Sequence, residues 1–381
     1  MGNCDSSIES MRLKHSSRQN ISKDYKVFSS NFSSSSLPSV SSSFNMNQES
    51  QESSHNHKRN NSIVKNNPLS NKQYLLPERI AKREDITKKY RISKKVIGDG
   101  ATSLVYLGEN KAKEKFALKR IFKEKISSRH NIMEEAEILF KLKHKNIIKY
   151  YEIYEDINFI NIVMELGDTD LFELIVNSPL GIIPEDLAID FLIQIFEAID
   201  YLHNAVNIVH CDIKPENFVV KYDKKTEKFV LKLCDFGNSR NRPINKERLF
   251  NFCGTKEYMP PEALEDRGFN EKVDEWAAGI IMYNMLTGAD PFSSSNDLEY
   301  RDNIKFKEIN FNYIKNEDLR ELNKKLLNRF MAKRISAREA LEEIKKIKKN
   351  YNINNNIKGI IEEKNFVNII VRNKISLMNI S

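Results

Sequence analysis

One stretch of eight residues constrains this chain more than any other part of its sequence: His210-Cys211-Asp212-Ile213-Lys214-Pro215-Glu216-Asn217. Apolar runs lie directly before and after it, at 207–209 and 218–220, as is typical of a loop between two buried strands. A carboxylate can accept a proton from a hydroxyl group, a lysine can hold phosphate charge, and an asparagine can bind a hard cation. The stretch is therefore a candidate catalytic loop.

The composition limits the class of protein. At 381 residues the chain is long enough for two or three compact units with a sizeable core. Its net charge is +8, but acids and bases are interspersed, and neither zinc-finger spacing nor an aromatic-rich basic patch is present, so we expect no nucleic-acid partner. The four cysteines form no C-x-x-C pair and fit reduced, cytoplasmic thiols. No apolar run approaches the roughly 18 residues of a membrane-spanning helix.

The first six residues, from Met1 to Ser6, match the pattern for N-myristoylation of Gly2. Cys4 lies where a second acyl chain is often added, and the second chain matters because a single myristoyl chain binds membranes only marginally. We therefore expect residues 1–27 to anchor the chain to the inner leaflet of a membrane, which would make it cytoplasmic and membrane-associated. The alternative is an ordinary initiator methionine before a disordered tail.

Residues 28–85 are dominated by Ser, Asn and Gln. They hold too few apolar side chains to offset the entropy lost on ordering, so we predict a disordered linker. The folded domain is expected to begin near Tyr90.

The start of that domain has the pattern of a glycine-tipped hairpin. Strand-like residues at 90–97 are followed by glycines at 98 and 100, a return strand at 103–107 and a third strand at 115–121. Glycines at such a tip let backbone N–H groups approach phosphate oxygens. Two glycines alone would indicate only a turn, but a lysine follows at position 119, inside the third strand.

Further motifs follow in a fixed order along the chain. Residues 235–237 read D-F-G, residues 254–262 read G-T-K-E-Y-M-P-P-E, and residues 274–279 read D-E-W-A-A-G. Together with the loop at 210–217, these motifs resemble those of the protein kinase family, in its Ser/Thr branch. Three positions depart from the family's pattern: Cys211 replaces an arginine, Ser103 the third glycine of the hairpin, and Pro260 an alanine.

The resemblance implies an α+β, two-lobed protein-kinase fold across residues 90–346. A small β-rich N-lobe is expected at 90–164 and a larger helical C-lobe at 167–346, with a C-terminal tail at 347–381. The Met-Glu pair at the lobe junction and the acylation pattern resemble the calmodulin-kinase and calcium-dependent kinase group. No D-x-D-x-D-G loop is present, so EF-hands and direct calcium sensing are not expected. The expected state is a monomer.

By resemblance, the catalytic loop transfers the γ-phosphoryl group of ATP to a hydroxyl group of a protein. Asp212 orients that hydroxyl group and takes its proton, and Lys214 neutralises charge on the moving phosphoryl group. Asn217 and Asp235 hold Mg²⁺ on the nucleotide phosphates. ATP and Mg²⁺ are therefore the expected cofactors.

The resemblance also assigns the nucleotide site. Lys119 holds the α- and β-phosphates and is paired with Glu135, one of three acids on a helix expected at 130–142. Asp170 either lies near the ribose or N-caps the helix that follows it. The remaining expected contacts are Gly98, Gly100, Val105, Ala117, the gatekeeper Met164, and the hinge residues Glu165 and Leu166.

Lys214 together with Thr255 favours serine or threonine as the acceptor, since tyrosine kinases have other residues in the catalytic loop. Glu216 resembles the acid with which many kinases bind an arginine of the substrate, which indicates acceptors in a basic context. The alternative for Glu216 is an exposed loop acid. Arg334 is expected to pair with Glu262 and to stabilise the C-lobe.

Cys211 replaces an arginine that in most relatives receives a phosphate from the activation loop. Between residues 235 and 254 the only hydroxyl side chain is that of Ser239, which lies too early for the usual phosphorylation site. The phosphate site and its arginine receiver are both missing from the sequence, so we predict activity without activation-loop phosphorylation. The alternative is a catalytically weak pseudokinase that serves as a membrane-tethered scaffold.

Overall fold

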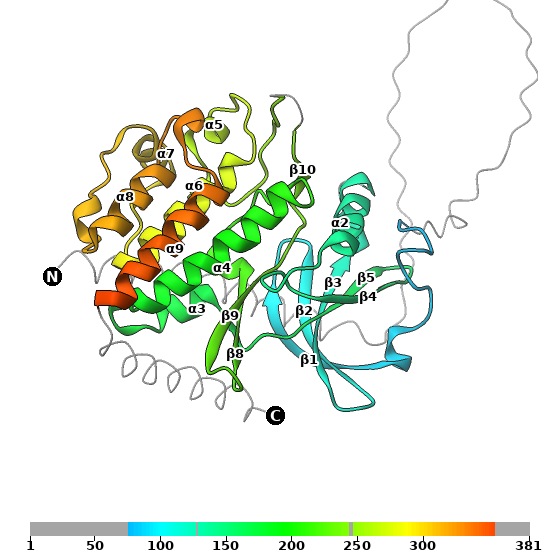
Figure 1. Ribbon diagram of the computed structural model, residues 1–381. Coiled ribbons are helices and arrows are strands. Elements are labelled where there is room, and N and C mark those ends of the chain that lie inside the picture. Colours follow the sequence, from blue (N-terminus) through cyan, green and yellow to red (C-terminus); the bar gives the residue numbers. More distant parts are fainter. Residues whose placement is uncertain (1–74, 127–128, 244–246, 355–381) are drawn as a thin grey trace, which may run out of the picture. The chain divides into compact units, whose positions relative to one another are not determined.

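The computed structural model describes residues 75–126, 129–243 and 247–354 (Figure 1). The predicted acylation residues Gly2 and Cys4, most of the predicted linker and most of the predicted C-terminal tail lie outside the described residues. Among the residues that are described, no helix combines the length and the apolar character needed to cross a membrane.

A five-stranded antiparallel sheet forms the N-lobe, with the strand order β1-β2-β3-β5-β4. Helix α2 (Arg129–Lys141) belongs to the same lobe (Figure 1). Apolar side chains of the central strand β3, among them Leu118 and Ile121, are buried and form part of the core. The strands are β1 (Tyr90–Asp99), β2 (Ser103–Asn110), β3 (Lys115–Phe122), β4 (Tyr150–Glu155) and β5 (Phe159–Met164).

The C-lobe is built around α6 (Lys272–Thr287), whose side chains are almost all buried. Helix α4 (Glu185–Asn204) packs along α9 (Ala337–Asn354) and also contacts α6 (Figure 1). The other helices are α3 (Leu171–Val176), α5 (Pro261–Leu264), α7 (Asp297–Phe306) and α8 (Glu317–Leu326).

Short strands position the catalytic loop, which lies between β7 and β8. Strand β7 (Ile208–Val209) pairs with β10 (Arg240–Asn241), and a second small sheet has the order β6-β8-β9. Its strands are β6 (Thr169–Asp170), β8 (Phe218–Asp223) and β9 (Lys228–Leu233). The 3₁₀ helices are η1 (Ile86–Lys88), η2 (Lys123–Lys125), η3 (Pro179–Gly181), η4 (Pro215–Asn217), η5 (Lys256–Tyr258), η6 (Phe311–Tyr313) and η7 (Met331–Lys333). The predicted α+β, two-lobed fold is confirmed.

The prediction of a disordered linker as far as residue 85 is wrong for residues 75–85. Leu76, Ile80 and Ala81 are buried, and the amide of Lys82 donates a hydrogen bond to a carbonyl of β4. Residues 75–81 form a short apolar cluster, with Leu75, Leu76, Pro77, Ile80 and Ala81, which the polar composition of the whole stretch 28–85 obscures. Leu76, Ile80 and Ala81 become buried because the folded N-lobe offers them an apolar surface.

The last helix extends beyond the domain end predicted at residue 346. Helix α9 continues to Asn354, with Ile347 buried and Tyr351 packed against the core. Apolar side chains at 344, 347 and 351 recur at helical spacing, so this side of the helix continues the apolar face of its first turns.

Candidate active site

The main chain of the catalytic loop is held by one buried acid. Asp274, near the start of α6, accepts hydrogen bonds from the amides of His210 (2.8 Å) and Cys211 (2.9 Å). Cys211 has a φ of 63°, a left-handed conformation that few residues other than glycine adopt. The two bonds to Asp274 stabilise this turn, and Asp212 follows it directly.

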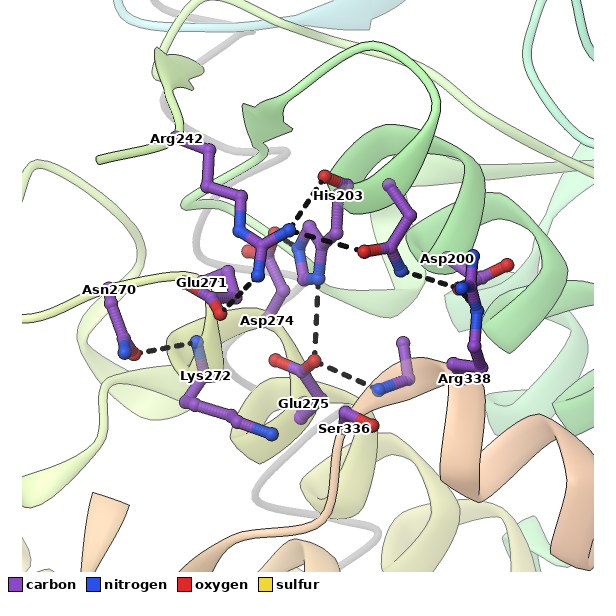
Figure 2. Close-up of polar contacts among 12 residues, drawn as sticks. Asp200, His203, Arg242, Asn270, Glu271, Lys272, Asp274, Glu275, Ser336 and Arg338 are labelled. Carbon is purple, nitrogen blue, oxygen red and sulfur yellow. Dashed lines mark hydrogen bonds and ion pairs between the residues drawn. The ribbon is translucent and has the colours of Figure 1, made fainter. Parts of the chain in front are cut away.

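A buried histidine supports that acid (Figure 2). His203, near the end of α4, lies 2.9 Å from Asp274 through Nε2 and 3.3 Å from Glu275 through Nδ1. Burial disfavours a charged imidazole, but the carboxylates of Glu275 and Asp274 outweigh burial and raise the pKa of His203 to about 10. His203 is therefore an imidazolium ion at neutral pH, and its positive charge offsets part of the negative charge of the two carboxylates.

Arg242 ties the activation segment, by which we mean residues 235–254, to the same region (Figure 2). Its Nη2 lies 2.7 Å from Glu271 Oε1, and its Nη1 donates to the carbonyl of His203 at 3.0 Å. The side chain is mostly buried, with 30% of it exposed. The activation segment is therefore joined to the end of α4 by a hydrogen bond and to Glu271, the residue before α6, by an ion pair.

Asp212, Lys214 and Thr255 form a compact polar group. Oδ1 of Asp212 accepts hydrogen bonds from the amide and the hydroxyl group of Thr255, at 2.9 and 2.6 Å. Lys214 Nζ lies 3.2 Å from Oδ2 of Asp212 and donates to the hydroxyl oxygen of Thr255 at 2.9 Å. Burial raises the pKa of Asp212, but the charge of Lys214 and the hydrogen bond from Thr255 lower it by more. The pKa of Asp212 therefore lies below its ordinary value. Asp212 is thus a carboxylate at neutral pH, as a proton acceptor must be.

Lys119 links three parts of the chain. Its Nζ lies 3.1 Å from Oε1 of Glu135 on α2 and 2.7 Å from Oδ1 of Asp235, which follows β9. The predicted pair with Glu135 is therefore present. Burial disfavours the charge of Lys119, but the two carboxylates outweigh it and its pKa is raised. In turn the Lys119 charge lowers the pKa of Asp235 to about 2.

The two residues predicted to bind Mg²⁺ are neighbours across the loop. The amide of Cys234 donates to the carbonyl of Asn217 at 2.8 Å, and Asp235 follows Cys234 directly. The side-chain N–H group of Asn217 donates a hydrogen bond to the Asp212 carbonyl at 2.7 Å. The side-chain oxygen of Asn217 is therefore left to bind a cation. Asp235 keeps 47% of its side chain exposed. Because Mg²⁺ prefers oxygen ligands and often uses one carboxylate together with substrate phosphates, this donor set fits a metal held jointly with a nucleotide.

The glycine-tipped hairpin is present between β1 and β2. Gly98 lies opposite Val105 in the strand pairing, and the amide of Gly100 donates to the carbonyl of Ser103 at 2.9 Å. The predicted phosphate-binding glycines therefore lie at the tip of this hairpin.

The predicted hinge follows β5. Ala117 on β3 lies opposite the predicted gatekeeper Met164, so these two predicted nucleotide-site residues are strand partners. The carboxylate of Glu165 forms ion pairs with two lysines of β8 and β9 and thereby ties the hinge, which continues through Leu166, to the C-lobe. Gly167 was missed by sequence reasoning: a Cβ there would lie 1.9 Å from a side-chain carbon of β8, so only glycine fits.

Asp170 N-caps α3, which is one of its two predicted roles. Its Oδ1 accepts the amide of Glu173 at 2.8 Å. Burial raises the pKa of Asp170 to about 7. The contact with a ribose remains a prediction, as does the contact of Glu216, on η4, with a basic substrate.

Arg334 and Glu262 form the ion pair predicted for the C-lobe. The guanidinium donates to both carboxylate oxygens, at 2.7 and 3.1 Å, and both side chains are buried. Such a two-fold contact is stronger and more specific than a single hydrogen bond. It fixes the segment that follows Thr255.

Sequence reasoning missed His203 and Arg242. Neither belongs to a local motif: His203 is the one histidine near the end of a long helix, and Arg242 is one of several basic residues in its segment. The acid Asp274 was recognised as part of the motif at 274–279, but its bonds to the catalytic loop were not predicted. His203 lies 71 residues before Asp274 in the chain, so no local sequence pattern connects the two.

Comparison with known proteins places these features in a family. Residues 90–344 match the family described as Protein kinase domain. The chain is 37% identical over 215 residues to Serine/threonine-protein kinase DCLK3 of Mus musculus, which covers 55% of this chain and 26% of that protein. It is 38% identical over 205 residues to Myosin light chain kinase A of Dictyostelium discoideum, and the aligned region covers 52% of this chain and 67% of that protein. It is 32% identical over 257 residues to Calcium-dependent protein kinase 4 of Plasmodium berghei (strain Anka), and the aligned region covers 65% of this chain and 48% of that protein. The chain spans only 19% to 37% of the length of DCLK3 and three further curated relatives.

Proposed function

The chain belongs to the protein kinase family, in its Ser/Thr branch, and on this premise we propose that it transfers the γ-phosphoryl group of ATP to serine or threonine hydroxyl groups of proteins. The observation that carries the proposal is the placement of Lys119 within 3.1 Å of Glu135 and 2.7 Å of Asp235. This ion triad brings the predicted phosphate-binding lysine and the predicted metal-binding acid together. A pseudokinase would not need both.

The residues divide the reaction among themselves. Asp212 accepts the proton of the attacking hydroxyl group, the bond between that oxygen and the γ-phosphorus forms, and the bond from the phosphorus to the ADP oxygen breaks. Lys214, 3.2 Å from Asp212, stabilises negative charge on the phosphoryl group in transit. Asn217 and Asp235 would hold Mg²⁺, which when bound neutralises charge on the phosphate oxygens.

Thr255 supports serine or threonine as the acceptor because it donates to Asp212 and accepts from Lys214 at the place where the hydroxyl group must bind. Glu216 supports a basic residue near the acceptor. A peptide library in which the acceptor is Ser, Thr or Tyr tests both points by mass spectrometry. Phosphorylation of the tyrosine peptides alone would contradict the proposal.

We further propose that the enzyme is active without phosphorylation of its activation segment. Leu249 and Phe269 exchange two backbone hydrogen bonds of 2.8 Å, and Arg242 pairs with Glu271 at 2.7 Å. These contacts support an activation segment whose described parts, before residue 244 and after residue 246, are held by residues of the chain itself. A membrane-tethered scaffold without catalysis is the competing function, and it would bind partners equally well after Asp212→Asn.

Tethering to the cytoplasmic face of a membrane through acyl chains on Gly2 and Cys4 is also part of the proposal. It is supported by the pattern of residues 1–6. Protein co-expressed with an N-myristoyltransferase should float with liposomes that contain anionic lipid, and Gly2→Ala should remain in the soluble fraction. A monomeric state is expected and can be measured in the same samples.

A further inference from the structure

Ahead of β1, the chain covers the open edge of the N-lobe sheet. Lys82 pairs in parallel with Tyr154 of β4, which is an edge strand. The amide of Lys82 donates to the carbonyl of Ile153, and the amide of Glu155 donates to the carbonyl of Lys82, both at 2.9 Å. Because an uncovered edge leaves backbone groups unpaired, residues 75–83, which we call the strap, protect part of this edge.

A buried acid closes the strap onto β4. Glu155 is only 1% exposed, and its carboxylate accepts the amides of Leu75 and Leu76 at 2.6 and 3.1 Å. It also pairs with Arg83 and with Lys123. Three of these four partners belong to the strap. A buried carboxylate that loses its partners is strongly destabilised, so the strap and β4 form one structural unit.

The strap also contacts α2, the helix that carries Glu135. Arg79 Nη2 lies 3.0 Å from Glu137 Oε1, two residues further along that helix. Leu76 and Ile80 belong to the same buried apolar cluster as the inner face of α2. The ion pair between Arg79 and Glu137 is exposed and contributes to the register of the contact, whereas the burial of Leu76 and Ile80 holds the strap on the N-lobe.

We propose that the strap is a positioning segment for phosphoryl transfer, which holds α2 where Glu135 reaches Lys119. The proposal rests on the proposed kinase function. Lys119 Nζ and Glu135 Oε1 are 3.1 Å apart, close to the limit of a good hydrogen bond, so a shift of α2 by about 1 Å would break the contact. Lys119 would then be held by Asp235 alone and would turn away from the phosphates.

The full-length chain tests the proposal with one buried and one exposed position of the strap. Leu76→Asp should detach the strap and lower kcat/KM for ATP about 10- to 100-fold, with KM for the peptide substrate unchanged. Glu78→Ala, at an exposed position of the same segment, should leave both constants unchanged. A synthetic peptide of residues 75–88, added to the Leu76→Asp protein, should restore the activity, whereas the same peptide carrying Leu76→Asp should not.

Exposed residues provide a second test that does not depend on the stability of the Leu76→Asp protein. Arg79→Glu should lower kcat/KM for ATP about two- to fivefold, and the double variant Arg79→Glu/Glu137→Arg should recover it. If the wild-type chain phosphorylates no serine or threonine peptide, the proposed function is wrong. If the wild type is active and the folded Leu76→Asp protein is equally active, the strap proposal is wrong. If Leu76→Asp does not fold, an Arg79→Glu protein with unchanged kcat/KM, or without recovery in the double variant, overturns it.

Discussion

The main-chain amide of Cys211 donates a hydrogen bond of 2.9 Å to Oδ1 of Asp274. The Cys211 side chain is buried in an apolar cluster with Phe269, against which Leu249 and Phe252 of the activation segment pack. The catalytic loop and the activation segment are therefore joined by apolar contacts at the position where the resemblance leads one to expect an arginine and a phosphate.

Cys211→Arg should destabilise the protein and should not activate it. The guanidinium would enter an apolar cluster without a partner, at a cost of about 3 kcal/mol or more in the free energy of unfolding. Cys211→Ala, which removes one buried atom, should cost about 1 kcal/mol. Urea unfolding and a peptide assay measure the two effects. An arginine variant of wild-type stability and higher activity would contradict the role assigned to this cluster.

Gly254→Ala should disturb the contact between the activation segment and the catalytic loop. A Cβ at this position would lie 2.1 Å from the carbonyl oxygen of Cys211, so the backbone must move. We expect a loss of about 1–3 kcal/mol in stability and at least a tenfold loss in kcat, because Thr255 and Asp212 would separate. Gly108→Ala is the matched control, since the nearest atom to its Cβ is 3.8 Å away. Equal losses of stability and of kcat in the two variants would contradict a role for the close contact between Gly254 and Cys211.

The stability of the folded state should fall as the pH rises from about 6.5 to about 10. The pKa of His203 is raised from its ordinary value of 6.5 to about 10, so the protonated form stabilises the fold. This contribution is complete below pH 6.5 and is lost as the pH rises through the folded-state pKa. In His203→Gln the free energy of unfolding, measured in urea at several pH values, should depend less on pH over this interval. A slope identical to that of the wild type would contradict an imidazolium at this site.

Arg242 and Glu271 should be energetically coupled. A double-mutant cycle with Arg242→Gln and Glu271→Gln should give a coupling of about 0.5–1 kcal/mol, since the pair is only partly exposed. Arg242→Gln should also speed proteolysis within the activation segment, because its tether to α4 is lost. The tether is contradicted if the effects of the two single substitutions on the free energy of unfolding are additive and if Arg242→Gln leaves the rate of proteolysis unchanged.

The sequence was sufficient to predict which side chains come together where those residues lie in one motif. Asp212, Lys214 and Asn217 share a single loop, and Lys119 lies on a strand whose pattern is local. The pair with Glu135 also followed, because the helical pattern of α2 offered three acids and the resemblance selected Glu135 among them. Each of these assignments depends on short-range periodicity and on one resemblance.

The contacts that hold the loop could not be predicted, because they join segments far apart in the chain. Asp274 meets His203 and the Cys211 amide only after α4, α6 and the loop have packed together. The strap escaped notice for a related reason. Leu76 lies in a short apolar cluster at the end of a long polar stretch, and its amide bonds to Glu155, which from the sequence alone is an ordinary acid at a strand end.

The most direct measurement is phosphoryl transfer by protein whose activation segment carries no phosphate. The full-length chain, shown by mass spectrometry to be unmodified at Ser239 and throughout residues 235–254, is incubated with Mg-ATP and serine and threonine peptides. The account predicts steady turnover by the wild type, and at least a hundredfold lower rate for Asp212→Asn, whose amide cannot accept the proton. Equal rates for the two proteins, or a wild type that remains silent until another kinase modifies it, would contradict the account.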